Sequence, residues 1–251
     1  MVAENFQIPR YAQSRLLVGR SGPYVRAIIC LLLVMITALL PGVVFAHGVD
    51  EGTQQFLVNN EGIAILPFLY IGAKHMVTGY DHLLFLIGVI FFLYRPKDVL
   101  LYVSFFTLGH SLTLLVGVYQ DIQVNAYLID AIIGLSIVYK GFDNLGGFQR
   151  CFGFQPNTKA AVLIFGLFHG FGLATKLQGF EFAREGLLQN LLAFNVGVEI
   201  GQFLALTFIV IGLTFWRRYA SYLKFAATTN VALMSAGFLL TMYQLAGYLV
   251  Y

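Results

Sequence analysis

Charged residues are scarce in this chain. Only 11% of its 251 residues are Asp, Glu, Lys or Arg, whereas 59% are hydrophobic. A soluble domain carries about 25% charged residues, so the composition excludes an ordinary soluble domain. The net charge is only +3 and the basic residues are scattered, which argues against nucleic-acid binding. We therefore expect an all-α fold, a polytopic transmembrane helical bundle in a lipid bilayer.

Cysteine is also scarce, and several common motifs are missing. The two cysteines, Cys30 and Cys151, lie far apart, and Cys30 falls within the first hydrophobic run. If that run is removed, the remaining cysteine has no partner for an internal disulfide. The sequence contains no CxxC metal motif, no Walker-type nucleotide motif and no HExxH motif. The last absence argues against a metalloenzyme, and we expect a chain that is not an enzyme.

The N-terminal segment has the pattern of a signal peptide. Residues 1–26 contain four arginines and one acidic residue, and an apolar run follows at 27–40. This run is shorter than the ~20 residues that a spanning helix needs. Val44 and Ala46 then fit a signal-peptidase site. We expect residues 1–46 to be a signal peptide, with a retained first helix as the alternative.

Six hydrophobic segments follow in the remaining domain, 47–251, and each is about as long as a bilayer requires. Their expected limits are 77–94, 99–119, 124–142, 159–177, 188–215 and 227–250. The first, third and fifth connections are the basic ones, which places them in the cytoplasm and the mature N-terminus outside. We expect a multi-pass membrane protein. Three spans per half would also make the halves inverted relative to each other, a common transporter plan, although the two halves resemble each other only weakly.

Ionisable side chains within the apolar segments are the best clue to function. They are costly at membrane depth and usually face partners or a pathway, and imidazole with carboxylate suits divalent metals such as nickel, cobalt and zinc. The candidate metal ligands are His75, Asp81, His82, His110, His169 and Glu199. Residues expected to bind the metal more weakly or to support its ligands are His47, Asp130, Asn195, Gln202, Thr107 and Ser111.

The spacing of His75 and His82 sets a geometric problem. The two residues are seven apart, so on a straight helix they share a face but lie about 10 Å apart along the axis. Either Gly79 lets the chain bend, or the two histidines serve successive positions along a route. Asp81 should point to a different side from His82 and orient an imidazole of another helix. The alternative for any single histidine is a hydrogen bond to a neighbouring helix.

Two further helices carry polar patches. Thr107, His110 and Ser111 lie close together on one helix, where the hydroxyls also suit packing between helices. On another helix, Asn195 and Glu199 begin a stripe at i, i+4 and i+7. We interpret this stripe as the wall of a site. The alternative is a buried, neutral carboxyl group that is hydrogen-bonded to the amides.

The remaining candidates are more isolated. His169 lies among glycines, which allow close helix packing or an unwound turn whose carbonyls face a cation. Asp130 is expected near the outer end of its span, where a helix cap or a solvated residue is the default. His47 would become the new N-terminus after cleavage, and its amine and imidazole together can chelate a cation.

Four motifs in order, over nearly the whole mature chain, resemble the HupE/UreJ family of bacterial membrane proteins. They are His-x5-Asp-His at 75–82, Phe-Thr-x-x-His-Ser-x-Thr at 106–113, Phe-His-Gly-x-Gly at 168–172 and Phe-Asn-x-Gly-x-Glu-x-Gly-Gln at 194–202. The resemblance implies a secondary permease for nickel or cobalt in the bacterial inner membrane, associated with hydrogenase or urease maturation. It also implies that His75, Asp81 and His82 take part in metal passage, and it extends less directly to His169 and Glu199.

The sequence as a whole predicts a secondary permease for a divalent transition metal. Nickel or cobalt is the expected ion, and zinc or copper also fits the ligands. The ion would be collected near His75, with help from His47, and would pass to a midplane site built from His82, His110, His169 and Glu199. The alternatives are a membrane subunit with a structural metal or a docking role, and an intramembrane metalloenzyme. A homo-oligomer or a membrane-complex partner stays open.

Overall fold

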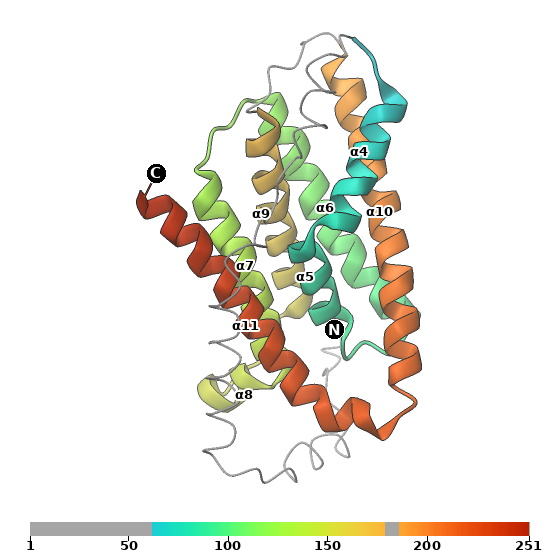
Figure 1. Cartoon of the computed structure of the whole chain (residues 1–251), viewed down its shortest axis with the longest axis vertical. Coiled ribbons are helices and arrows are strands. Elements are labelled where there is room, and N and C mark those ends of the chain that lie inside the picture. Colours follow the sequence, from blue (N-terminus) through green and yellow to red (C-terminus); the bar gives the residue numbers. More distant parts are fainter. Residues whose placement is uncertain (1–61, 179–185, 251) are drawn as a thin grey trace, which may run out of the picture.

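The computed structural model describes residues 62–178 and 186–250. The expected signal peptide and His47 lie outside these residues. Within them, every regular element is a helix, as the composition predicts (Figure 1). The helices are α4 (Ile65–Thr78), α5 (Tyr80–Ile90), α6 (Pro96–Tyr119), α7 (Ala126–Asn144), α8 (Gly147–Phe152), α9 (Thr158–Gln178), α10 (Leu187–Trp216) and α11 (Ala220–Val250).

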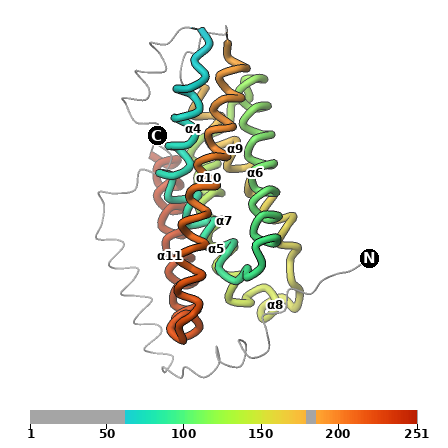
Figure 2. Tube along the Cα trace, turned by 90° about the vertical axis from the view of Figure 1, so that its right-hand side faces the viewer, coloured from blue at the N-terminus to red at the C-terminus, as the bar shows by residue number. Residues whose placement is uncertain are grey.

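The long helices run along the bundle, and α8 lies at one end of it (Figures 1 and 2). Four helices, α6, α9, α10 and α11, are long and apolar enough to cross a membrane. Helix α7 is also long but carries three ionisable side chains, Asp130, Lys140 and Asp143. The structure therefore supports a multi-pass membrane protein with four such helices, and the expected number of six remains a prediction.

The first expected span, 77–94, is replaced by two helices that meet at Gly79. Helix α4 begins 12 residues before the expected span, and α5 has only 11 residues. Gly79 has an extended backbone with φ −73° and ψ 102°, which interrupts the helical hydrogen-bond ladder. The other five expected spans coincide with helices, although α11 begins at Ala220 rather than at 227.

The helices associate in three pairs, α4 with α10, α6 with α9 and α7 with α11. Glycines allow the backbones of each pair to touch. A Cβ atom on Gly109 of α6 would lie 2.5 Å from the carbonyl oxygen of Leu163 on α9. A Cβ atom on Gly197 of α10 would lie 2.0 Å from the carbonyl oxygen of Leu69 on α4. Any larger residue at either position would push the paired helices apart.

The contacts of the α6–α9 pair recur in the α10–α4 pair at constant offsets in sequence. Gly109 meets Leu163 and Leu167 of α9. Gly197 of α10 lies 88 residues after Gly109. It contacts Leu69 and Ala73 of α4, and these lie 94 residues before Leu163 and Leu167. The same offsets relate the contact of Gly166 with Phe106 to the contact of Gly72 with Phe194. They also make the following residues equivalent: His75 with His169, Thr107 with Asn195, and Ser111 with Glu199.

These contacts also give the relative directions of the helices. The α4–α10 and α6–α9 pairs are each parallel, because residue numbers increase together along both helices. The α7–α11 pair is antiparallel, since Gly134 meets Gly237 whereas the later residue Gly141 meets the earlier residue Asn230. An approximate two-fold axis across the bundle therefore exchanges the first two pairs and maps the third onto itself. This pairing agrees with the expected inverted relation of the two halves, whereas three spans per half remain a prediction.

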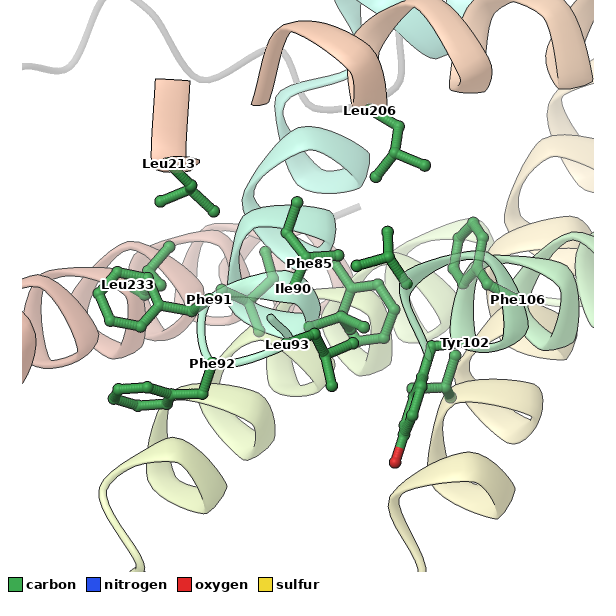
Figure 3. Packing of buried hydrophobic residues seen from close by; sticks show 14 of the residues in the cluster. Phe85, Ile90, Phe91, Phe92, Leu93, Tyr102, Phe106, Leu206, Leu213 and Leu233 are labelled. Atoms are coloured by element: carbon green, nitrogen blue, oxygen red, sulfur yellow. The ribbon is translucent and has the colours of Figure 1, made fainter. Parts of the chain in front are cut away.

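Helix α5 lies in the middle of the bundle and contacts α4, α6, α7, α10 and α11. Apolar side chains surround its C-terminal half, including Phe85 and Ile90 of α5 with Leu206 of α10 (Figure 3). Arg217 donates hydrogen bonds to the carbonyls of Ile90 and Phe91 at distances of 2.7 and 2.6 Å. A cation at this end also complements the helix dipole. The short helix is thereby held in place and one end of the bundle is filled.

Candidate metal-binding site

The break at Gly79 brings His75 and His82 together. Their ring centroids are 5.2 Å apart, about half the axial separation that a straight helix would impose. The structure therefore favours the bend over successive positions. A Cβ atom on Gly79 would lie 3.0 Å from His82 Nδ1 and 3.1 Å from the His75 carbonyl oxygen. Gly79 thus provides both the extended backbone and the space in which the two histidines approach.

His82 is the centre of a cluster of four histidines. Its ring centroid lies 5.0 Å from that of His169 and 5.8 Å from that of His110, in addition to the contact with His75. The four rings come from four helices, α4, α5, α6 and α9. His82, His110 and His169 are fully buried. The structure therefore assembles, across helices, the four intramembrane histidines that the sequence singled out.

Three of these histidines lie close enough together to be candidate ligands of one metal ion. Nitrogen atoms of His75, His82 and His110 all lie within 4.8 Å of one another. Two imidazole nitrogens on one ion, each about 2.1 Å from it, lie at most about 4.2 Å apart. Small rotations of the side chains would close the remaining gap. Three imidazoles leave coordination positions open for water, for a further ligand or for exchange.

A hydrogen bond orients the ring of His169. His169 Nδ1 lies 2.7 Å from the carbonyl oxygen of Phe165. A carbonyl can only accept, so Nδ1 carries the proton and Nε2 keeps a lone pair. That Nε2 atom is buried and has no hydrogen-bond partner among the described residues. Both ring nitrogens of His110 are likewise buried and have no hydrogen-bond partner among the described residues. Buried polar atoms usually find partners, so these nitrogens suit a ligand that the protein alone does not supply.

Asp81 acts on its own neighbour, contrary to our expectation. Its Oδ1 atom lies 3.2 Å from Nδ1 of His82, whereas the sequence predicted contact with an imidazole from another helix. Asp81 directly precedes His82 in the chain, and it can reach Nδ1 because Nδ1 is the ring nitrogen nearer the backbone. An ionised Asp81 accepts a hydrogen bond from Nδ1–H and leaves Nε2 of His82 free to bind a metal. Asp81 is fully buried and brings negative charge to the cluster.

The polar stripe on α10 divides into two parts. Asn195 accepts a hydrogen bond from Ser111 at 3.0 Å, and Gln202 accepts one from Thr107 at 2.9 Å. These four side chains join α6 to α10, which corresponds to the alternative of packing between helices. Glu199 is exposed. It lies roughly 40° around the helix from Asn195, beyond the edge of the buried face, so the structure does not bring it to the histidine cluster.

Asp130 is buried rather than solvated, and its partner was not anticipated from the sequence. Only 6% of Asp130 is exposed, and its Oδ2 atom accepts a hydrogen bond from Lys176 Nζ at 2.7 Å. A signal for Lys176 was present, since it follows His169 by seven residues and so lies on the same face of α9.

An all-helical bundle with several apolar membrane-length helices and a buried histidine cluster defines a polytopic membrane protein. Comparison with known proteins agrees with this class. The family model described as HupE / UreJ protein matches residues 51–251. The chain therefore belongs to the HupE/UreJ family. No curated protein and no solved structure matches it.

Proposed function

We propose that this protein is a secondary permease for a divalent transition metal, nickel or cobalt. The observation that carries the proposal is the approach of His75, His82 and His110 nitrogens within 4.8 Å inside the bundle. Imidazole nitrogens bind borderline metals such as nickel and cobalt well. Ligands without thiolate also release these ions readily, which transport requires.

The charge of the site supports passage of a dication. Moving a doubly charged ion into an apolar interior is prohibitive unless other charges and ligands compensate. Asp81 is buried beside His82 and offsets part of that charge. The imidazoles replace the water molecules around the ion.

The architecture supports movement of the ion as well as binding. In many transporters the substrate site lies where two inverted repeats meet, and one helix near it is interrupted. Here His75 and His169 are equivalent residues of the two halves, and the first half is interrupted at Gly79. Rocking of one half against the other would open the cluster to the two sides of the membrane in turn. The missing nucleotide motif leaves an ion gradient, or the metal gradient itself, as the energy source.

Transport by the purified protein in liposomes tests the proposal. Nickel and cobalt uptake would be followed with a trapped metal-sensitive dye for wild type, His82→Ala and Glu199→Gln. We expect uptake by wild type, none above background for His82→Ala, and near wild-type uptake for Glu199→Gln. The last variant is a matched control because Glu199 is also ionisable but exposed. Binding without uptake by wild type would refute the permease and favour a docking subunit or an enzyme.

A further inference from the structure

The Asp130–Lys176 ion pair lies outside the cluster of four histidines, and its cation, Lys176, shares α9 with His169. It joins α7 to α9 toward the end of the bundle at which α9 stops (upper part of Figure 1). The two side chains differ in accessibility, since that of Asp130 is 6% exposed and that of Lys176 is 19% exposed. The cation is therefore the partner nearer to the surface, and the carboxylate is the partner nearer to the interior.

This ion pair uses only one of the two carboxylate oxygens of Asp130. Oδ2 binds Lys176, whereas Oδ1 is buried and has no hydrogen-bond partner among the described residues. Oδ1 faces Gly172, whose absent Cβ atom would lie only 3.4 Å away. Gly172 is three residues from His169 on α9, which places the two on neighbouring parts of one helix face. A buried carboxylate oxygen thus lies against the part of α9 that follows His169.

Lys176 lies further along the same face of α9. It is seven residues, or about 10 Å, beyond His169. The ion pair and the cluster are coupled electrostatically, since Asp81 and His82 act on Asp130 and Lys176 acts on His75. A single positive charge near the cluster repels a dication strongly, since such interactions are poorly screened in a protein interior.

We propose that Asp130 is an additional binding position for the metal ion and that Lys176 occupies this position as a tethered, competing cation. The inference rests on the proposed function, since it needs a dication at the histidine cluster. An arriving dication repels the ammonium group, whose flexible four-carbon stem and partial exposure allow it to move toward the surface. Asp130 then joins Asp81 as a second negative charge facing the ion. Return of Lys176 to Asp130 favours release.

Metal binding to the full-length protein in detergent tests this proposal by the direction of the change. Calorimetric titration with nickel chloride and cobalt chloride would compare wild type with Lys176→Gln, Lys176→Arg and Asp130→Asn. Removal of the competing charge should tighten binding by about tenfold or more for Lys176→Gln. Lys176→Arg keeps the charge and should stay within about threefold of wild type. Asp130→Asn should weaken binding by about tenfold.

A second buried ion pair on α7 supplies a matched control. Lys140 Nζ lies 2.5 Å from Asp143 Oδ2, and both residues are buried. Asp143 lies 13 residues from Asp130, or about 20 Å along the helix. Lys140→Gln also leaves a buried carboxylate without its cation, yet it should leave the metal affinity unchanged. A gain of affinity confined to Lys176→Gln would support competition at the site.

The remaining outcomes separate the two proposals. If Lys176→Gln weakens binding, leaves it unchanged, or changes it as Lys140→Gln does, the competing-cation proposal is overturned. In that case the histidine site would still be supported if wild type binds the metal and His82→Ala does not. If wild type binds neither nickel nor cobalt, both proposals fail. Misfolding cannot imitate the expected result, because a misfolded variant does not gain affinity.

Discussion

His75 and His169 are equivalent residues of two inverted halves, and both contact the same ring, that of His82. Their centroids lie 5.2 and 5.0 Å from it. An offset of 94 residues relates the two histidines and also relates the helix contacts around them. The cluster thus lies where the two halves of the bundle meet, with one equivalent histidine contributed by each half.

Replacement of Gly79 by Ala should impair the metal site. A Cβ atom at this position would crowd His82 Nδ1 and the His75 carbonyl oxygen at 3.0 and 3.1 Å. It would also favour a continuous helix, which separates the two histidines. We expect metal affinity to fall by about tenfold or more, measured by titration with nickel. Gly212→Ala is the control, since nothing lies within 4 Å of its new Cβ atom, and an equal loss in both variants would contradict the role of the break.

Replacement of Asp81 by Asn should weaken metal binding without destroying the cluster. The amide keeps the size of the side chain but removes the negative charge beside His82. Loss of a group that orients a metal-binding histidine typically costs about 10–100-fold in affinity. The same titration measures the effect, and an unchanged thermal unfolding temperature of the metal-free protein would show that the fold is intact. Wild-type affinity in Asp81→Asn would mean that this carboxylate has no part in binding.

Replacement of Gly197 or Gly109 by Ala should destabilise the bundle to a similar extent. The new Cβ atoms would lie 2.0 and 2.5 Å from backbone oxygens of the paired helices. Overpacking of this kind costs about 1–3 kcal/mol or more. Thermal unfolding in detergent measures the loss against Gly212→Ala. A large effect at one glycine and none at the other would argue against equivalent roles for the two helix pairs.

The sequence predicted the helical class, five of the helices and the four clustered histidines, because hydrophobic length and buried ionisable groups are local signals. It did not decide whether Gly79 bends the chain, since a glycine is tolerated both in a membrane helix and at a break. Contact with the neighbouring helices fixes that choice.

Two other features depended on which face of a helix is covered. Glu199 belongs to an apparent polar stripe. However, α10 packs against α4 through Gly197 and Gly201, so these glycines mark its buried face. Glu199 is consequently exposed. The Asp130–Lys176 pair joins residues 46 apart in sequence, so only the packing of α7 on α9 could identify it. The sequence does carry a signal of the repeat, since Gly-x-x-His at 72–75 recurs at 166–169.

The central claim is that imidazoles from several helices bind one metal ion together. X-ray absorption spectroscopy of the nickel-loaded protein tests it most directly, because imidazole rings give a characteristic scattering pattern beyond the nearest atoms. The account predicts about three imidazole nitrogens at about 2.1 Å, and one fewer in His82→Ala if that variant still retains nickel. A shell of oxygen atoms without imidazole scattering in the wild-type protein would contradict it.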